Sequence, residues 1–437
     1  MTTTSEAPAD RLAARLYDQL YDEDEDSRVC RDISDEACRV VPGNFFRNTL
    51  AQAASKLGDA LINPKTTLPW LLTSLQAPGW IAGLLVPIRE SGSMLPQLGI
   101  AAWVRRLPVR KWSYVGGAVA QALVVIGLAL TALTLTGAAA GYAVLGLVVV
   151  FSLARGFSSV ASKDVLGKTV PKTRRGRVTG FASSAAGLGT LVFAVVLWFS
   201  PDGDRPYAVL LGFAGLLWLV SAAVYSTIRE APGATEGGAN GLREAFERLS
   251  VLRDDAGFRR FLAARALLVG SGLAAPFLVV LANQKASTSL AYFFVAQGLS
   301  SLISGPAWGA LADRSSRRLL LLTACGAGTL GSVVFLVDRW APGIASTAWF
   351  LPGAFFLLAL LHDGVRLARK TYVVDLAGGN KRTDYVAVGN TLIGAFLLVV
   401  GGITAVVQQF STGAAILLLS LAAFAAAWVA RRLPEVQ

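Results

Sequence analysis

The chain has 437 residues, of which 54% are hydrophobic and 16% are charged, and its mean hydropathy is +0.54. This composition excludes an ordinary soluble domain and predicts a polytopic membrane protein. The formal net charge of +12 would suit a nucleic-acid-binding protein. Residues 1–44, however, hold eleven acids against five arginines, and most other lysines and arginines stand between apolar segments. This pattern indicates orientation in a membrane by the positive-inside rule, so no nucleic-acid partner is expected.

Residues 1–44 are predicted to form an acidic cytoplasmic tail. Residues 10–21 place leucines four positions apart, as in an amphipathic helix, and a second short helix is predicted from Ser34 to Val41. The acidic run between them must stay solvated. The tail is either a gating or partner-binding element or a solubilising extension that lies against the cytoplasmic face. Cys30 and Cys38 are expected to be reduced there.

Twelve apolar segments follow the tail, and each is long enough to cross the hydrocarbon core as a helix. They lie at residues 45–72, 80–103, 113–135, 142–162, 178–199, 207–228, 258–282, 290–312, 319–337, 346–368, 386–408 and 412–430. The polar segment 229–257 between the sixth and seventh is predicted to be a cytoplasmic linker with a surface helix over residues 242–252. Six plus six helices place both termini, including residues 431–437, in the cytoplasm.

The loop between the eighth and ninth segments carries the most specific pattern in the chain. It reads Gly309-Ala-Leu-Ala-Asp313-Arg314-Ser-Ser-Arg317-Arg318. Small residues there let a neighbouring helix approach closely, and Asp313 is expected to accept hydrogen bonds from Arg317 or from a helix end. The spacing Gly-x-x-x-Asp-Arg-x-x-Arg-Arg resembles the signature loop of the major facilitator superfamily, the twelve-helix secondary transporters.

An internal repeat agrees with this resemblance. Phe46, Gly58 and Pro64 match Phe258, Gly270 and Pro276 at a constant offset of 212. Two parallel repeats with a binding site near the membrane midplane are how the superfamily is built. We therefore predict an all-α membrane protein whose twelve transmembrane helices form two pseudo-symmetric six-helix bundles, residues 45–228 and 258–430.

Ionisable residues lie unusually often inside the predicted spans. At membrane depth such residues are costly and are functional candidates by default. The candidates for substrate binding are the cations Lys56, Arg89, Arg155, Arg265 and Arg366. The candidates for proton coupling or gating are Asp59, Glu90, His362 and Asp363. Arg47 and Lys65 stand near the ends of the first span and are expected to reach the interface.

Helical spacing and the repeat predict how the first of these charges are arranged. Lys56 and Asp59 are three positions apart on one helix and are expected to pair. In the repeat, Arg265 corresponds to a position one helical turn from Lys56, on the same face of the first helix. Lys56 and Arg265 are therefore expected to face each other across a cavity. This arrangement resembles that of the organophosphate/phosphate antiporters of the superfamily, except that a lysine cannot form the bidentate fork of an arginine.

The remaining charges allow two further pairs. Arg89 and Glu90 point about 100° apart on a helix, so we expect one to reach the cavity and the other to bond a neighbouring helix. Asp363 can pair with Arg366 on its own helix or with Arg155 across the cavity, as a gate. Each pair can equally be a structural salt bridge.

The excess of cations predicts a small anionic or zwitterionic solute. No Gly-x-x-x-x-Gly-Lys-Ser/Thr stretch occurs, so a gradient must drive transport, and Asp59, Glu90 or His362 is expected to couple it to protons. His362 can equally be a packing residue. We predict a monomeric transporter in the plasma membrane. It is not expected to be an enzyme or to need a cofactor or metal. The alternatives are an exporter of amphipathic compounds or lipid flippase, and a non-transporting sensor or assembly factor that acts through the acidic tail.

Overall fold

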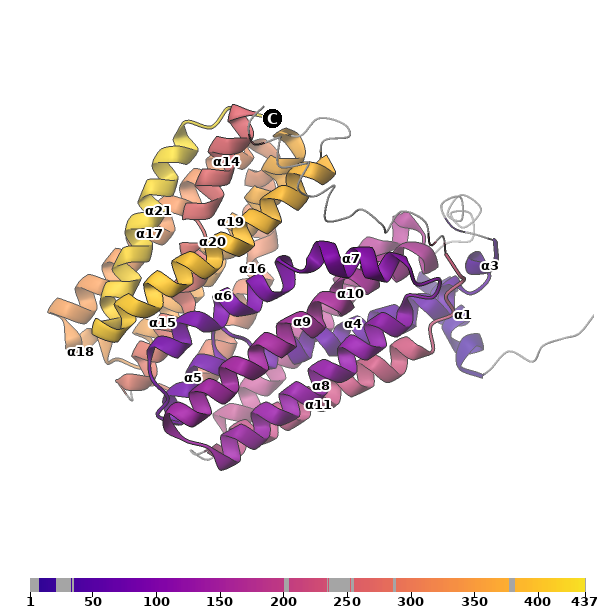
Figure 1. The fold of residues 1–437 in the computed structure, drawn as a ribbon, viewed down its shortest axis with the longest axis horizontal. Helices are drawn as coiled ribbons and strands as arrows, with labels where there is room; N and C mark the ends of the chain where they lie inside the picture. The colour runs from indigo at the N-terminus through magenta and orange to yellow at the C-terminus, as the bar shows by residue number, and fades with distance from the viewer. Residues whose placement is uncertain are drawn as a thin grey trace, which may run out of the picture.

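A computed structural model describes residues 8–20, 33, 35–199, 204–233, 235, 252, 255–285, 288–376 and 382–436. Within these ranges the chain is helical and contains no β-strand. The long helices form two bundles whose axes diverge toward the end where α1 (Pro8–Leu20), α3 (Asp35–Cys38) and the C-terminus lie (Figure 1).

Each bundle supplies six membrane crossings. The first contains α4 (Val41–Leu61), α5 (Thr67–Ser74), α6 (Trp80–Met94), α7 (Gln97–Arg105), α8 (Lys111–Thr134), α9 (Gly137–Thr169), α10 (Lys172–Trp198) and α11 (Asp204–Ser226). The second contains α14 (Ala256–Leu267), α15 (Gly270–Gln284), α16 (Leu290–Arg314), α17 (Ser316–Trp340), α18 (Pro342–Ala345), α19 (Phe350–Leu376), α20 (Arg382–Phe410) and α21 (Thr412–Arg431). The pairs α4–α5, α6–α7 and α14–α15 each occupy one predicted span. Nine segments of the described chain are long and apolar enough to cross a membrane by themselves. The crossings built on α4, α6 and α16 are not among them.

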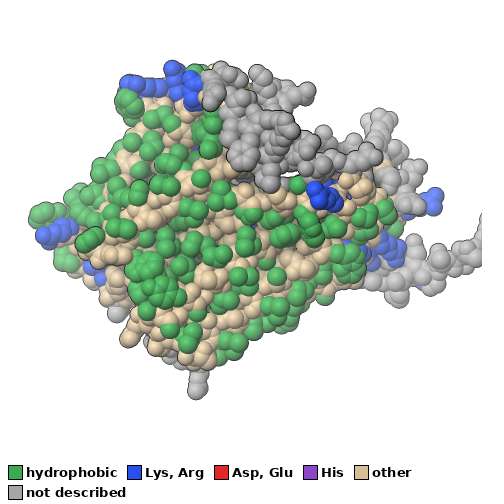
Figure 2. All heavy atoms as spheres, viewed as in Figure 1, with side chains coloured by type: hydrophobic (Ala, Val, Ile, Leu, Met, Phe, Trp, Pro, Cys, Tyr) green, Lys and Arg blue, Asp and Glu red, His purple; other side chains and the backbone are tan. Residues whose placement is uncertain are grey.

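The sides of both bundles are apolar. Hydrophobic side chains cover the face shown in Figure 2, and lysines and arginines gather at the bundle ends. Val209 is 72% exposed and Phe410 is 85% exposed. Large apolar side chains exposed over a whole face suit contact with lipid, because a soluble protein rarely leaves so broad an apolar surface in water.

The first predicted span is broken. We predicted one helix over residues 45–72, but α4 ends at Leu61 and the chain turns at Pro64 before α5 begins. Proline disfavours helical conformation at the residue before it. At the other end, Pro42 lies in the first turn of α4, where its missing N–H costs nothing. Among the described residues, the short helix predicted from Ser34 to Val41 is only the four-residue helix α3.

The amphipathic helix predicted in the tail is α1, and it packs on the first bundle. Tyr17 is 2% exposed, and its ring lies edge-on to Phe45 of α4, with centroids 5.6 Å apart. Cys38 is disulfide-bonded, so the prediction that it is reduced is wrong. The acidic run of the tail lies outside the described residues, as does the predicted surface helix apart from Leu252.

The two bundles touch closely between α6 and α20. A Cβ atom on Gly401 would lie 2.2 Å from Cγ of Pro87, so only glycine fits there. The Ser91 hydroxyl donates to the carbonyl of Gly394 at 2.6 Å. Small residues allow such close approach of helices in membranes. The bundles also meet between α10 and α16.

Aromatic side chains join the bundles at the end opposite the termini. Trp70 of α5 lies 6.2 Å from Phe293 of α16, measured between ring centroids. Trp198 of α10 lies 4.7 Å from Tyr292 of α16. The Trp70 indole N–H is satisfied by the Tyr207 hydroxyl at 2.8 Å. The molecule is thus closed at this end, while the bundle axes diverge toward the other (Figure 1).

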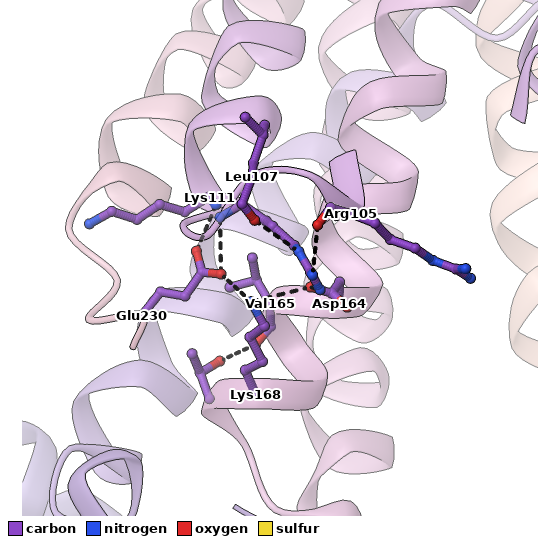
Figure 3. A network of polar contacts seen from close by, with 9 residues as sticks. Arg105, Leu107, Lys111, Asp164, Val165, Lys168 and Glu230 are labelled. Atoms are coloured by element: carbon purple, nitrogen blue, oxygen red, sulfur yellow. Dashed lines mark hydrogen bonds and ion pairs between the residues drawn. The ribbon is translucent and has the colours of Figure 1, made fainter. Parts of the chain in front are cut away.

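A buried glutamate after α11 holds the start of α8. The Glu230 carboxylate accepts hydrogen bonds from the backbone N–H groups of Arg110 at 3.0 Å and Lys111 at 2.7 Å, and from Lys168 Nζ at 3.1 Å (Figure 3). N–H groups at the start of a helix lack intrahelical partners and favour a negative charge. The Glu230 side chain is fully buried, and Arg110 also pairs with Asp164 of α9. This network ties α8, α9 and the end of α11 together.

Glu435 occupies the equivalent place after α21. It accepts hydrogen bonds from the Ser315 hydroxyl at 2.8 Å and from Arg317 Nε at 3.1 Å, at the start of α17. Its side chain is 34% exposed, whereas that of Glu230 is not exposed at all. The carboxylate that follows the last helix is therefore buried in the first bundle and partly exposed in the second.

The difference in burial predicts unequal effects of removing the two carboxylates. Glu230→Ala should lower the free energy of unfolding by about 3 kcal/mol, because Lys168 and two helix-start N–H groups lose a buried partner. Glu435→Ala, the matched control, should cost less than about 1 kcal/mol, as for exposed ion pairs. Denaturant unfolding of the purified protein in detergent measures both. Equal losses of unfolding free energy in the two variants would contradict the conclusion that burial makes Glu230 the more stabilising carboxylate.

Candidate functional site

A cavity of about 520 Å³ lies between the bundles. The first bundle contributes α4, α6, α9 and α10 to its walls, and the second contributes α15, α16 and α19. Eight charged side chains and one histidine line it: Lys56, Asp59, Lys65, Arg89, Glu90, Arg155, His362, Asp363 and Arg366. The structure thus brings together every residue predicted for substrate binding or proton coupling except Arg265.

Asp59 is the centre of the charges on the first bundle. Arg89 Nη2 lies 2.9 Å from Asp59 Oδ1, and Arg155 pairs with the other carboxylate oxygen. The Arg89 guanidinium also lies over the Phe151 ring, 4.6 Å from its centroid. The predicted pair of Lys56 with Asp59 is not formed. Both oxygens of the carboxylate bind guanidinium groups that arrive from α6 and α9, and a guanidinium suits a carboxylate better than an ammonium does.

Lys56 is held by neutral groups instead. Its Nζ donates to the Thr179 carbonyl at 3.0 Å and to the Ser183 hydroxyl at 2.7 Å, both on α10. An ammonium has three N–H donors, so one donor is left for another acceptor. Because Lys56 lines the cavity and has no carboxylate partner among the described residues, its remaining N–H donor can bind a ligand there.

The charges of the second bundle are paired more loosely. Asp363 and Arg366 of α19 lie 3.7 Å apart, and the Arg366 side chain is 52% exposed. Arg155, the alternative partner of Asp363 across the cavity, is bound to Asp59. The cross-cavity pair is therefore not formed in this conformation.

His362 is packed against α15. Its Nδ1 lies 3.0 Å from the Ser271 hydroxyl, and a Cβ atom on Gly272 would lie 2.9 Å from the ring. The ring thus fits a space that a glycine leaves open, and it also lines the cavity.

Arg265 lies outside the main cavity. Its Nη2 donates to Asn390 Oδ1 of α20 at 2.8 Å, and its side chain lines a smaller chamber of about 140 Å³. The prediction that Arg265 faces Lys56 is therefore wrong. The repeat places these residues on equivalent helices, but Arg265 belongs to α14, which ends at Leu267 before a break in the seventh crossing.

From the sequence, one lining residue was placed wrongly and another was missed. Lys65, expected at the interface, lines both the main cavity and the chamber, because the turn at Pro64 ends α4 early. Arg369 also lines the chamber and was not predicted. A signal was present, since Arg366 and Arg369 are three apart and share a helix face.

The signature loop lies away from the cavity. Ser315 caps α17 by accepting from the N–H of Arg318, and Arg317 pairs with Glu435. Arg314 and Arg318 are exposed, and no atom approaches a Cβ built on Gly309 within 4 Å. The side chain of Asp313 lies outside the described structure. In this conformation, Arg317 is thus bound by the C-terminal segment.

Comparison with known proteins gives one family. A family model described as Major Facilitator Superfamily matches residues 49–394. Two curated proteins, "Uncharacterized protein Rv2209" of Mycobacterium tuberculosis (strain ATCC 25618 / H37Rv) and "Uncharacterized protein Mb2232" of Mycobacterium bovis (strain ATCC BAA-935 / AF2122/97), are each 26% identical over 416 residues, which are 92% of this chain and 78% of the relative.

Solved transporters share the fold. The inward open xylose transporter XylE from E. coli has a TM-score of 0.62 at 15% identity, over 92% of this chain and 97% of that one. A mutant of the nucleoside transporter NupG has a TM-score of 0.66 at 12% identity, over 89% and 99% of the two chains. The helices described above thus have the arrangement of these transporters.

The two aspartates of the cavity should contribute unequally to the stability of the fold. Asp59→Asn should lower the free energy of unfolding by about 3 kcal/mol, because it leaves the buried Arg89 without a carboxylate. Asp363→Asn should change it by less than about 1 kcal/mol, because Arg366 is largely exposed. Thermal unfolding of both variants in one detergent makes the comparison. A mild effect of Asp59→Asn would show that the cluster does not hold the first bundle.

Proposed function

Because this chain belongs to the Major Facilitator Superfamily, we propose that it is a proton-coupled secondary transporter of a small anionic or zwitterionic solute. The observation that carries this proposal is the charge of the cavity. Five cationic side chains line it against three carboxylates. A solute with carboxylate, phosphate or sulfate groups offsets that excess, whereas a cationic solute is repelled.

The lining also disfavours the alternative of a flippase or an exporter of amphipathic compounds. Such substrates need a largely apolar surface with few polar groups. Here charged side chains from α4, α6, α9 and α19 meet at one place. A polar solute that gives up its water shell can replace it with hydrogen bonds from Lys56, Arg155 and Arg366.

In the proposed cycle the cavity is open to the cytoplasm. Cytoplasmic termini put the divergent ends of the bundles on that side, and the aromatic contacts of Trp70 and Trp198 on the outside. Rocking of the bundles about the α6–α20 and α10–α16 contacts would expose the same site to the other side. We place the protein in the plasma membrane as a monomer, with residues 1–44, 229–257 and 431–437 in the cytoplasm.

Glu90 is the carboxylate that we assign to proton coupling. It lines both the main cavity and the chamber, so water in either space can reach it. Its side chain makes no ion pair or hydrogen bond with the described residues, in contrast to Asp59, which is bound by two arginines. A carboxylate without a fixed partner can take up a proton without breaking an ion pair.

Anion binding tests the substrate class. We expect a screen of small carboxylates, phosphates and sulfates to raise the thermal stability of the purified protein, because a ligand that binds only the folded state stabilises it. Lys56→Gln should weaken the best anion at least about tenfold, which corresponds to about 1.4 kcal/mol. Arg339→Gln removes an exposed cation that lines neither the cavity nor the chamber, and it should have no effect. Unchanged affinity in Lys56→Gln would remove this residue from the site.

Transport in proteoliposomes tests the coupling. With the anion found in that screen, an imposed pH gradient should drive accumulation by the unaltered protein. Glu90→Gln should still exchange the solute across the membrane but should lose accumulation, because a glutamine carries no titrating proton. If Glu90→Gln accumulates solute as well as the unaltered protein does, another group carries the proton.

A further inference from the structure

The small chamber beside the main cavity is more basic than the cavity itself. Lys65, Arg265, Arg366 and Arg369 line it, and Glu90 is its only carboxylate among the described residues. Lys65, Glu90, His362 and Arg366 line both spaces, so the chamber is a side pocket of the cavity. Its other walls are mainly apolar side chains of α6, α15, α17, α19 and α20, which do not compensate the positive charge.

Arg265 has unused donors at this place. The residue is 8% exposed, and its Nη2 bonds Asn390, but its Nε is buried without a hydrogen-bond partner in the described structure. A Cβ atom on Gly389 would lie 3.0 Å from its Nη1, so a glycine on α20 leaves room for the guanidinium. A buried donor without an acceptor is costly, and a buried charge is more so.

Arg369 is unsatisfied in a similar way. Its side chain makes no ion pair or hydrogen bond with the residues that the structure describes, although it lines the chamber. Arg366, one turn away, has only its long contact with Asp363. Three guanidinium groups thus converge on a space of about 140 Å³ that holds no matching set of carboxylates.

We propose that this chamber is a second anion subsite, and that the transported solute carries two oxyanionic groups. This inference rests on the proposed function. One group, a carboxylate, phosphate or sulfate, binds in the main cavity beside Lys56 and Arg155. The other enters the chamber, where Arg265 and Arg369 supply the guanidinium donors that suit such oxygens. The chamber is large enough for one compact oxyanion, and the body of the solute occupies the larger cavity.

Counting bound anions tests the subsite. Equilibrium dialysis of the purified full-length protein against radiolabelled inorganic phosphate should give two phosphates per chain. Lys56→Gln should retain the chamber phosphate, and Arg265→Gln should retain the cavity phosphate, so each binds one. Arg369→Gln should also bind one, and it tests the chamber without removing the Asn390 hydrogen bond, which matters if Arg265→Gln fails to fold. Arg339→Gln, the surface control, should bind two.

The outcomes separate this inference from the proposed function. One phosphate per chain, lost in Lys56→Gln and kept in Arg265→Gln and Arg369→Gln, would overturn the second subsite and leave the anion transporter standing. Two phosphates in both chamber variants would overturn it as well. Failure of the unaltered protein to bind any phosphate, carboxylate or sulfate would overturn the proposed function itself.

A series of bisphosphonates with increasing spacer length distinguishes one solute with two groups from two separate anions. We expect one spacer length at which a single bisphosphonate displaces both phosphates and binds about 100-fold more tightly than methylphosphonate, because the second contact becomes intramolecular. Arg369→Gln should abolish that advantage, while Arg369→Lys, which keeps the charge, should restore part of it. Displacement of only one phosphate at every spacer length would overturn the claim that the solute is bis-anionic.

Discussion

One aspartate bound by two arginines fixes the inner wall of the first bundle. Asp59 of α4 binds Arg89 of α6 and Arg155 of α9, so three helices are tied at a single point within the membrane. Charged groups at that depth are costly unless they are paired, and the two oxygens of a carboxylate can each accept from one guanidinium. With one carboxylate for two cations, the cluster keeps a net positive charge beside the cavity. The positive site is thus a consequence of how the bundle is held together.

The two bundles share an architecture but differ in how firmly they are held. Glu230 and Glu435 each follow the last helix of a bundle and bind the start of its third crossing, α8 or α17. The first carboxylate is buried among N–H donors, whereas the second forms an exposed pair with Arg317. Exposed pairs contribute little to stability. The loop before α17 can therefore exchange partners at low cost, while the corresponding corner of the first bundle stays fixed.

Sequence patterns predicted the helices and most of the charged residues that line the cavity. They did not predict which of these residues form ion pairs with each other. The spans follow from hydropathy because the bilayer imposes one length on every crossing. Buried charges converge on the cavity because lipid excludes them elsewhere. Spacing placed Lys56 and Asp59 on one helix face, but it carries no information on arginines that reach the same carboxylate from α6 and α9. The places of Lys65 and Arg369 could not be predicted because they depend on where helices end. The helix α4 stops before Pro64, and α19 continues to Leu376.

Rigid rocking of two bundles changes only the distances between them, and this decides which charges can rearrange. Asp59 and both of its arginines belong to the first bundle, so the cluster moves as a unit. Asp363 stands on the second bundle in a long contact with an exposed Arg366 and can change partner at little cost. A pair between Arg155 and Asp363 would require Arg155 to leave Asp59. If the solute is the anion proposed above, its binding to Arg155 would weaken the bond to Asp59 and would couple solute binding to the rearrangement of the charges.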